Sequence, residues 1–158
     1  MPVRHSQIYL SSPEETAALA RRMGTILRPR DVLLLSGGIG AGKTHFARAL
    51  IQSLQDDPED VPSPTFTLVQ VYDTNAGELW HSDLYRLSHP DEIVELGLTE
   101  AFDTAICLIE WPDRLGDLVP DDALILHFAM AEVEGMRLLD LRWQPGHWED
   151  RLKGLVDD

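Results

Sequence analysis

The sequence at residues 32–44 reads VLLLSGGIGAGKT, an apolar run followed at once by a glycine-rich segment. The part from Gly37 to Thr44 fits the phosphate-loop pattern G-x-x-x-x-G-K-[ST]. Glycines allow the tight turn in which successive backbone N–H groups surround a phosphate, and the helix that follows adds the positive end of its dipole. The stretch therefore predicts a buried strand, a phosphate-binding loop and a helix.

The last residues of such a loop have specific tasks. Lys43 is predicted to reach the β- and γ-phosphates, and the Thr44 hydroxyl is predicted to bind Mg²⁺. The nucleotide-binding residues expected in this segment are Gly37, Gly38, Ile39, Gly40, Ala41, Gly42, Lys43, Thr44 and His45.

Helical and strand patterns alternate on both sides of the loop. Ser12 as an N-cap, with Pro13 and Glu15 after it, predicts a helix over 13–27. Further helices are expected at 43–55, 90–96 and 147–156, and strands at 32–35, 66–72, 78–82, 105–109, 123–130 and 137–143. This order predicts an α/β fold, a P-loop NTPase-like three-layer sandwich with a mixed β-sheet.

Composition limits the class of protein. A length of 158 residues with 44% hydrophobic content fits one domain over 1–158. No apolar stretch approaches the roughly 18 residues needed to cross a bilayer, and residues 1–6 lead into no secretory signal. We therefore expect a cytoplasmic protein. Cys107 lies in an apolar run, which favours a buried thiol over a nucleophile.

The formal net charge of −14 bears on possible partners. Unaided binding to DNA or RNA needs clustered Lys and Arg, because the contact must neutralise phosphates. The basic residues here are dispersed. We expect no DNA binding, and any role with RNA would run through a partner protein.

Phosphoryl transfer needs an acid that faces the phosphate loop, usually at the end of an apolar strand. Glu110 ends the predicted strand 105–109 and is the better match to a metal-binding acid. Asp83 ends the return strand of the predicted hairpin, where it would bind the metal or orient the attacking water. The six histidines show no metal-ligand spacing. His81 is the one that merits a test, because it lies two residues before Asp83 and so shares its strand face.

Two further residues are candidates for contact with a nucleotide. Thr65 lies in the stiff segment Ser63-Pro64-Thr65, which either senses the γ-phosphate or simply begins a strand. Trp111 follows Glu110 and either stacks on a base or fills core space. The single asparagine, Asn75, is followed by alanine, so the chain lacks the Asn-Lys-x-Asp segment that reads guanine, and adenine is the expected base.

Four motifs in this order, Gly40–Thr44, Ser63–Leu68, His81–Arg86 and Ile109–Pro112, give the chain a resemblance to the TsaE (YjeE) family over about 12–120. The resemblance implies a small bacterial ATPase that uses ATP and Mg²⁺ in making threonylcarbamoyladenosine in tRNA. It also implies TsaB and TsaD as partner proteins, with tRNA reached only through their complex.

The resemblance also implies roles for single residues. Lys43 would hold phosphates, Thr44 and Glu110 would bind Mg²⁺, and Asp83 would support hydrolysis. Thr65 would belong to a switch-like loop, Trp111 would lie near the nucleotide, and Ser12 and Thr16 would approach it. The departures from the family pattern are Gly38 in place of an acid, His45 in place of a second threonine, and Gly135-Met136-Arg137 in place of Gly-Arg, which leaves Arg137 as a nucleotide contact open.

The residues favour an ATPase, and the resemblance implies that it resets the TsaB–TsaD pair between modification cycles. Two alternatives stay open. A small-molecule kinase shares the loop and the fold, although no arginine-dense lid follows residue 86. A nucleotide-dependent scaffold would need ATP binding but not hydrolysis.

Overall fold

The structure is a computed structural model that describes residues 4–38, 42–62, 64, 68–87, 89–133 and 135–156. Its strands are β1 (Arg4–Leu10), β2 (Val32–Gly37), β3 (Val69–Thr74), β4 (Gly77–Asp83), β5 (Ile106–Glu110), β6 (Leu124–Met130) and β7 (Arg137–Trp143). Its helices are α1 (Pro13–Gly24), α2 (Lys43–Ser53), α3 (Asp91–Glu95), α4 (Leu98–Ala101), the 3-10 segment η1 (Pro112–Leu118) and α5 (His147–Val156).

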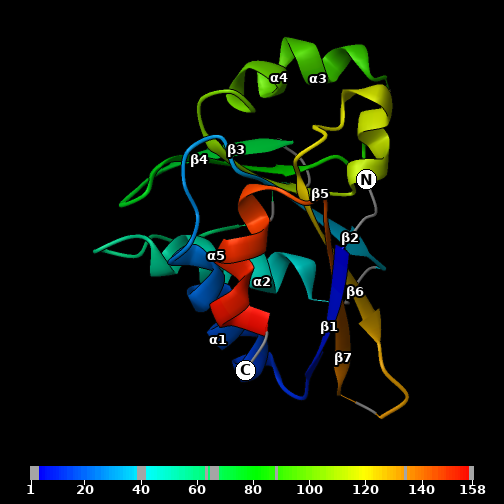
Figure 1. Ribbon diagram of the computed structural model, residues 1–158. Helices are drawn as coiled ribbons and strands as arrows, with labels where there is room; N and C mark the ends of the chain where they lie inside the picture. The colour runs from blue at the N-terminus through cyan, green and yellow to red at the C-terminus, as the bar shows by residue number, and fades with distance from the viewer. Residues whose placement is uncertain are drawn as a thin grey trace.

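The strands form one seven-stranded mixed sheet in the order β1-β7-β6-β2-β5-β4-β3 (Figure 1). The four central strands, β6, β2, β5 and β4, run parallel to one another. The outer pairs are antiparallel. The carboxyl ends of β2, β5 and β4 therefore meet at one edge of the sheet, where ligands bind in open α/β sheets.

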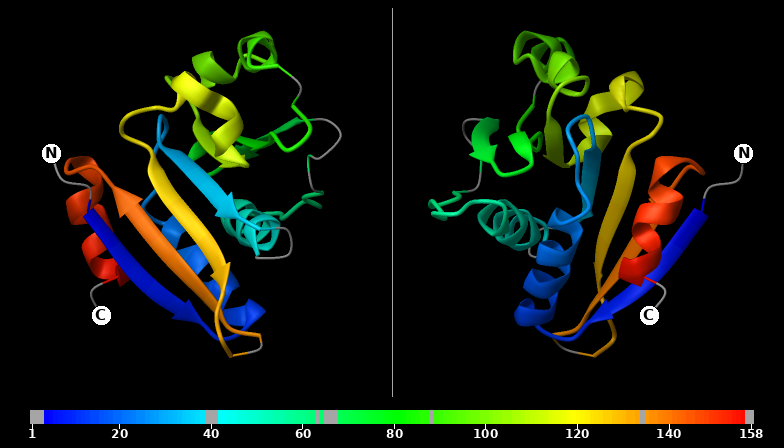
Figure 2. Two further views of the ribbon diagram at one scale, coloured as in Figure 1. Left: turned by 90° about the vertical axis from the view of Figure 1, so that its right-hand side faces the viewer. Right: turned by 60° about the vertical axis from the view of Figure 1, so that its left-hand side comes forward.

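Helices cover both faces of the sheet, which gives three layers (Figure 2). On one face, α1, α2 and α5 pack against Leu33, Leu35 and Leu108. On the other, α3, α4 and η1 pack against Leu34 and Ile109. Because neighbouring side chains of β2 point to opposite faces, its apolar run is buried on both sides. The predicted α/β sandwich with a mixed sheet is confirmed.

Three elements were not predicted from the sequence: β1, η1 and the short helix α4, which starts directly after Gly97. Strand β1 reads RHSQIYL, a weakly apolar alternation that is half exposed, and it is held by antiparallel pairing with β7. The segment η1 follows β5 directly and turns at Gly116. The predicted helix over 13–27 is shorter than expected, since α1 ends at Gly24 with Thr25 as its C-cap.

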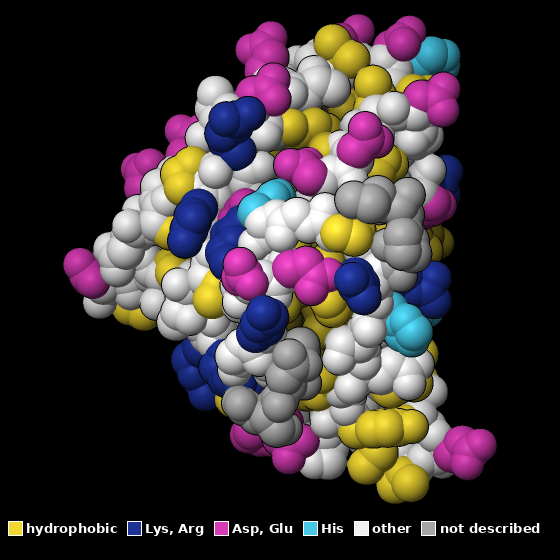
Figure 3. Space-filling model, in the orientation of Figure 1, with side chains coloured by type: hydrophobic (Ala, Val, Ile, Leu, Met, Phe, Trp, Pro, Cys, Tyr) yellow, Lys and Arg dark blue, Asp and Glu magenta, His cyan; other side chains and the backbone are white. Residues whose placement is uncertain are grey.

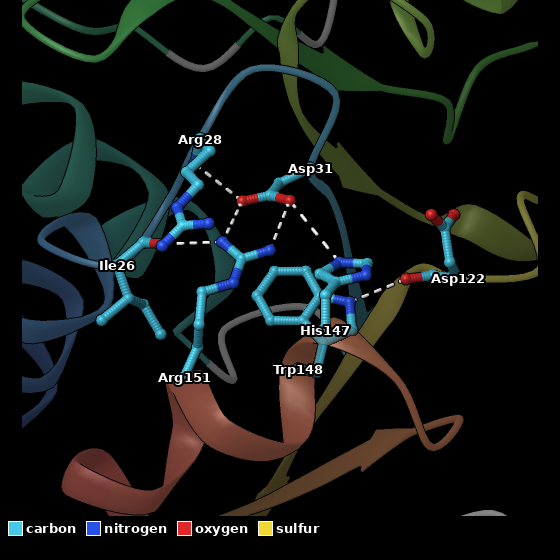
Figure 4. Close-up of polar contacts among 7 residues, drawn as sticks. All are labelled: Ile26, Arg28, Asp31, Asp122, His147, Trp148 and Arg151. Atoms are coloured by element: carbon cyan, nitrogen blue, oxygen red, sulfur yellow. Dashed lines mark hydrogen bonds and ion pairs between the residues drawn. The ribbon is translucent and has the colours of Figure 1, made fainter.

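The last helix, α5, is fastened to the start of β2 by a buried ion pair (Figure 4). Both guanidinium ends of Arg151 donate to Asp31, at 2.6 Å and 2.9 Å. Arg151 also donates to the Ile26 carbonyl at 2.6 Å, and the Trp148 indole donates to the Asp122 carbonyl at 2.7 Å. These contacts lie at the amino end of β2, on the opposite side of the molecule from the glycine-rich segment.

Acidic side chains are spread over the surface, and several gather over α3 and α4 (Figure 3). Lys and Arg side chains on the same face are separated by other residues and form no continuous stripe. Among the described residues, no helix has both the length and the apolar composition needed to cross a membrane.

Candidate active site

The glycine-rich segment leaves the carboxyl end of β2 and enters α2. Gly37 has φ 132°, and a Cβ placed on it would lie 2.2 Å from the Phe128 carbonyl oxygen of β6. Gly42, the N-cap of α2, has φ 109°. Residues other than glycine rarely adopt such backbone angles, so these two positions require glycine.

Glu110 and Thr44 are in direct contact. The Thr44 hydroxyl of α2 donates to Glu110 Oε1 at 2.7 Å. Glu110 ends β5, is 2% exposed, and lies beside Leu35 of β2 in the parallel register. The fold therefore brings the last residue of the glycine-rich segment into hydrogen-bond contact with the acid that was predicted to bind a metal.

Two residues of β4 lie beside Glu110. His81 is fully buried, and its Nε2 donates to Glu110 Oε2 at 2.6 Å. Asp83 stands opposite Glu110 in the β4–β5 register and is 6% exposed. One oxygen of Asp83 accepts the backbone N–H of Tyr85 at 3.0 Å.

Lys43 is folded back onto its own loop. Its Nζ donates to the Gly37 carbonyl at 2.7 Å and lies 3.6 Å from the centre of the Trp111 ring. The side chain is buried, and this burial lowers the pKa of the ammonium below its ordinary value. Carboxylates nearby oppose that shift in pKa in part: Glu110, Asp83 and Asp113.

Trp111 has an unusual backbone for a large residue, with φ 59°. Its ring packs between Lys43 and Tyr85, whose ring centre is 4.8 Å away. Strained backbone of this kind is common at binding sites. The structure thus places Trp111 beside Lys43 at the start of α2, while stacking on a base stays a prediction.

The start of α1 reaches the first turn of α2. His45 Nε2 lies 3.0 Å from the Pro13 carbonyl oxygen, one residue after Ser12. The Ser12 hydroxyl accepts the Glu15 N–H as the predicted N-cap, and the Thr16 hydroxyl donates to the Ser12 carbonyl. The start of α1 therefore lies against the first turn of α2, and contact of Ser12 and Thr16 with a nucleotide stays a prediction.

Other predicted residues are less closely tied to the site. Ile39, Gly40, Ala41 and Thr65 lie outside the described residues. Gly38 is exposed. Arg137 begins β7, two strands from β2, where it faces Met130 in the register, so its role as a nucleotide contact stays a prediction.

Cys107 is a buried thiol, as expected. It is fully enclosed, and burial raises its pKa to about 12. A thiol with so high a pKa is a poor nucleophile, because the thiolate is the reactive form.

The donor set at this edge of the sheet suits Mg²⁺ and phosphate. A hydroxyl and a carboxylate are hard oxygen ligands, and Mg²⁺ is commonly held by one or two such groups together with substrate phosphates. Within the described ranges, no three His, Cys, Asp or Glu side chains form a separate metal cluster. Two glycines with positive φ, an ammonium and the first turn of α2 suit a phosphate.

Sequence reasoning found most of these residues but missed two contacts. It placed His81 on the strand face of Asp83, yet did not predict its bond to Glu110, which depends on the pairing of β4 with β5. It named Trp111 without predicting its contact with Lys43, which depends on the backbone turn after β5. In both cases the residue type was visible in the sequence and the contact was tertiary.

Comparison with known proteins gives a consistent result. A family model described as threonylcarbamoyl adenosine biosynthesis protein TsaE matches residues 10–138. A tRNA threonylcarbamoyladenosine biosynthesis protein TsaE from Rickettsia bellii is 42% identical over 120 residues, which are 76% of this chain and 83% of that protein. The protein of the same description from Bacillus subtilis is 39% identical over 114 residues, or 72% of this chain and 70% of that protein.

The fold agrees with these relatives. The crystal structure of Bacillus subtilis YdiB superposes with a TM-score of 0.81 at 28% identity, covering 98% of this chain and 96% of that one. The family model spans both the glycine-rich segment and Glu110. The chain therefore belongs to the TsaE family of threonylcarbamoyl adenosine biosynthesis proteins.

Proposed function

We propose that this chain, as a TsaE-family member with a role in tRNA threonylcarbamoyladenosine biosynthesis, binds ATP with Mg²⁺ and hydrolyses the ATP. The bond of 2.7 Å between the Thr44 hydroxyl and Glu110 carries the proposal. A phosphate loop binds nucleotide in many proteins, but hydrolysis needs an acid opposite the loop, and Glu110 supplies one.

Each residue has a task that follows from its chemistry. The Thr44 hydroxyl donates a hydrogen bond to Glu110, which leaves the lone pairs of its oxygen available to a cation. Lys43 would exchange its bond to the Gly37 carbonyl for phosphate oxygens, where a cation is favoured. Bound Mg²⁺ would supply charge neutralisation for the phosphates, held by Thr44 and Glu110.

Asp83 is the second acid of the site. It stands beside Glu110 at the end of a neighbouring strand, which suits either metal binding or orientation of the attacking water. Because this chemistry depends on positioning and charge neutralisation, no covalent intermediate with the chain is required.

The proposed partners are TsaB and TsaD, and the proposed location is the cytoplasm. The net charge of −14 opposes a direct grip on tRNA, so the RNA would be reached through the partner pair. In this proposal, hydrolysis resets the partner complex between modification cycles and is slow without it.

The test is the substitution Glu110→Gln, which keeps size and polarity but removes the charge. We expect ATP binding to be retained and phosphate release, alone or with TsaB–TsaD, to fall by a factor of about 100 or more, as for loss of a charge-stabilising group. Phosphate release is measured without an acceptor. ADP formation that requires a metabolite would favour a kinase, and repeated modification cycles by Glu110→Gln would favour a scaffold.

A further inference from the structure

His81 is a polar residue at a fully buried position of β4, so its presence there calls for an explanation. Its side chain is fully buried, and Nδ1 has no hydrogen-bond partner among the described residues. Burying a polar ring costs free energy unless its nitrogens are paired. The bond from Nε2 to Glu110 at 2.6 Å is thus the polar contact that distinguishes histidine from an aliphatic residue here.

Both oxygens of Glu110 are held, each from a different element. Thr44 of α2 donates to Oε1 at 2.7 Å, and His81 of β4 donates to Oε2. A carboxylate with one donor can still turn about its last side-chain bond, whereas two donors on separate elements fix its plane. If the Thr44 oxygen turns to bind a cation, His81 on β4 would still hold the Glu110 carboxylate in its orientation.

We propose that His81 is a positioning residue for the Mg²⁺ site, acting through Glu110. The inference rests on the proposed function, because it assumes that Glu110 and Thr44 hold the ion. Carboxylates that bind metals are themselves oriented by hydrogen bonds, and loss of such a partner typically lowers metal affinity by a factor of 10–100. His81 does not bind the ion itself, since Nε2 is engaged with Glu110 and Nδ1 is enclosed.

Three substitutions separate the hydrogen bond from the bulk of the ring. His81→Gln keeps an N–H donor at about the position of Nε2. His81→Asn carries its donor closer to the backbone, out of reach of Glu110, and His81→Leu has no donor. Leu79→Ala is the matched control. Leu79 is buried on the same face of β4, two positions before His81, so its truncation loosens the core without removing a bond to Glu110.

The measurement is the affinity for a non-hydrolysable ATP analogue, determined by calorimetry on the full chain in EDTA and in Mg²⁺. We expect His81→Leu and His81→Asn to bind as wild type does in EDTA and to lose about tenfold or more of the gain produced by Mg²⁺. His81→Gln should recover most of that gain, and Leu79→Ala should keep it. A merely structural role would lower both affinities together.

Other outcomes would overturn the proposal. If folded His81→Leu and His81→Asn keep the wild-type gain from Mg²⁺, or if His81→Gln is as impaired as they are, His81 does not act through its donor. If His81→Leu fails to fold, the comparison of the Asn and Gln variants decides. If wild type shows no gain from Mg²⁺ and Glu110→Gln changes nothing, the Mg²⁺ site itself is wrong, which is a different result from failure at His81 alone.

The ring tautomer gives a second readout. A carboxylate can only accept from the ring, so Nε2 must carry the hydrogen. Long-range ¹H–¹⁵N spectra of the histidine ring should show the Nε2–H form in wild type, with and without the Mg²⁺-bound analogue. The Nδ1–H form would contradict the proposed bond.

Discussion

The ammonium of Lys43 is buried beside its own loop carbonyl and the ring of Trp111. Burial disfavours the charged form, so the pKa of Lys43 lies below its ordinary value of 10.5 although three carboxylates oppose the shift. Phosphate oxygens in contact with the ammonium would further favour its charged form. Nucleotide binding should therefore raise the pKa of Lys43 again.

This linkage predicts how ATP affinity depends on pH. The affinity should be constant up to the lowered pKa of free Lys43 and then fall by as much as about tenfold per pH unit, because binding must restore the lost proton. The fall should begin below pH 10.5. Competitive displacement of a fluorescent analogue between neutral and alkaline pH would measure it, and Lys43→Met should bind weakly with no such slope. A flat profile for wild type would contradict the assignment.

The parallel pairing of β2 with β6 limits which residue can stand at position 37, where the glycine-rich segment begins. An Ala side chain at Gly37 would meet the Phe128 carbonyl, a backbone atom that cannot move without shifting β6, and it would also have to adopt a positive φ. Gly37→Ala should therefore lower the free energy of unfolding by about 2–3 kcal/mol. Gly38→Ala is the control, because nothing lies within 4 Å of a Cβ there. Equal stability of the two variants by urea unfolding would argue against this reading.

The elements that could be predicted from the sequence are those with a strong local signal. The apolar run of β2, the glycine pattern and the capped start of α1 each depend on neighbours along the chain. Strand β1 has no such signal: its residues alternate weakly, and their position depends on β7, which follows more than a hundred residues later. The same holds for the site. Thr44 and Glu110 could be predicted as site residues from the motifs around them, whereas the bond between Glu110 and His81 could not.

The ion pair between Asp31 and Arg151 ties the end of the chain to the central strand. Both side chains are nearly buried, so loss of Arg151 removes the two closest charged contacts of Asp31 and leaves it with the Arg28 N–H and the more distant His147 ring. Arg151→Ala should lower the free energy of unfolding by about 3 kcal/mol. Lys153→Ala should have little effect, because its pair with Asp150 on the same helix is exposed. The free energies of unfolding of the two variants are compared by urea titration. Equally small losses in Arg151→Ala and Lys153→Ala would show that the buried pair adds no stability.

We also expect the chain to unfold in one transition. One sheet links all the strands, and the pair of Asp31 and Arg151 fastens α5 to it. Loss of α5 packing would expose apolar residues of the same core that supports α1 and α2. In urea, Arg151→Ala should therefore shift the midpoint of a single transition, seen alike by circular dichroism and by tryptophan fluorescence.

The pairing of β1 with β7 has a consequence for how the protein is made. During translation, residues 4–10 leave the ribosome before their hydrogen-bonding partner, residues 137–143, has been made. Strand β1 therefore stays without this partner until more than a hundred further residues have emerged. The edge of the sheet formed by β1 and β7 can therefore close only after β7 has been made, and β1 is exposed to wrong partners throughout that interval.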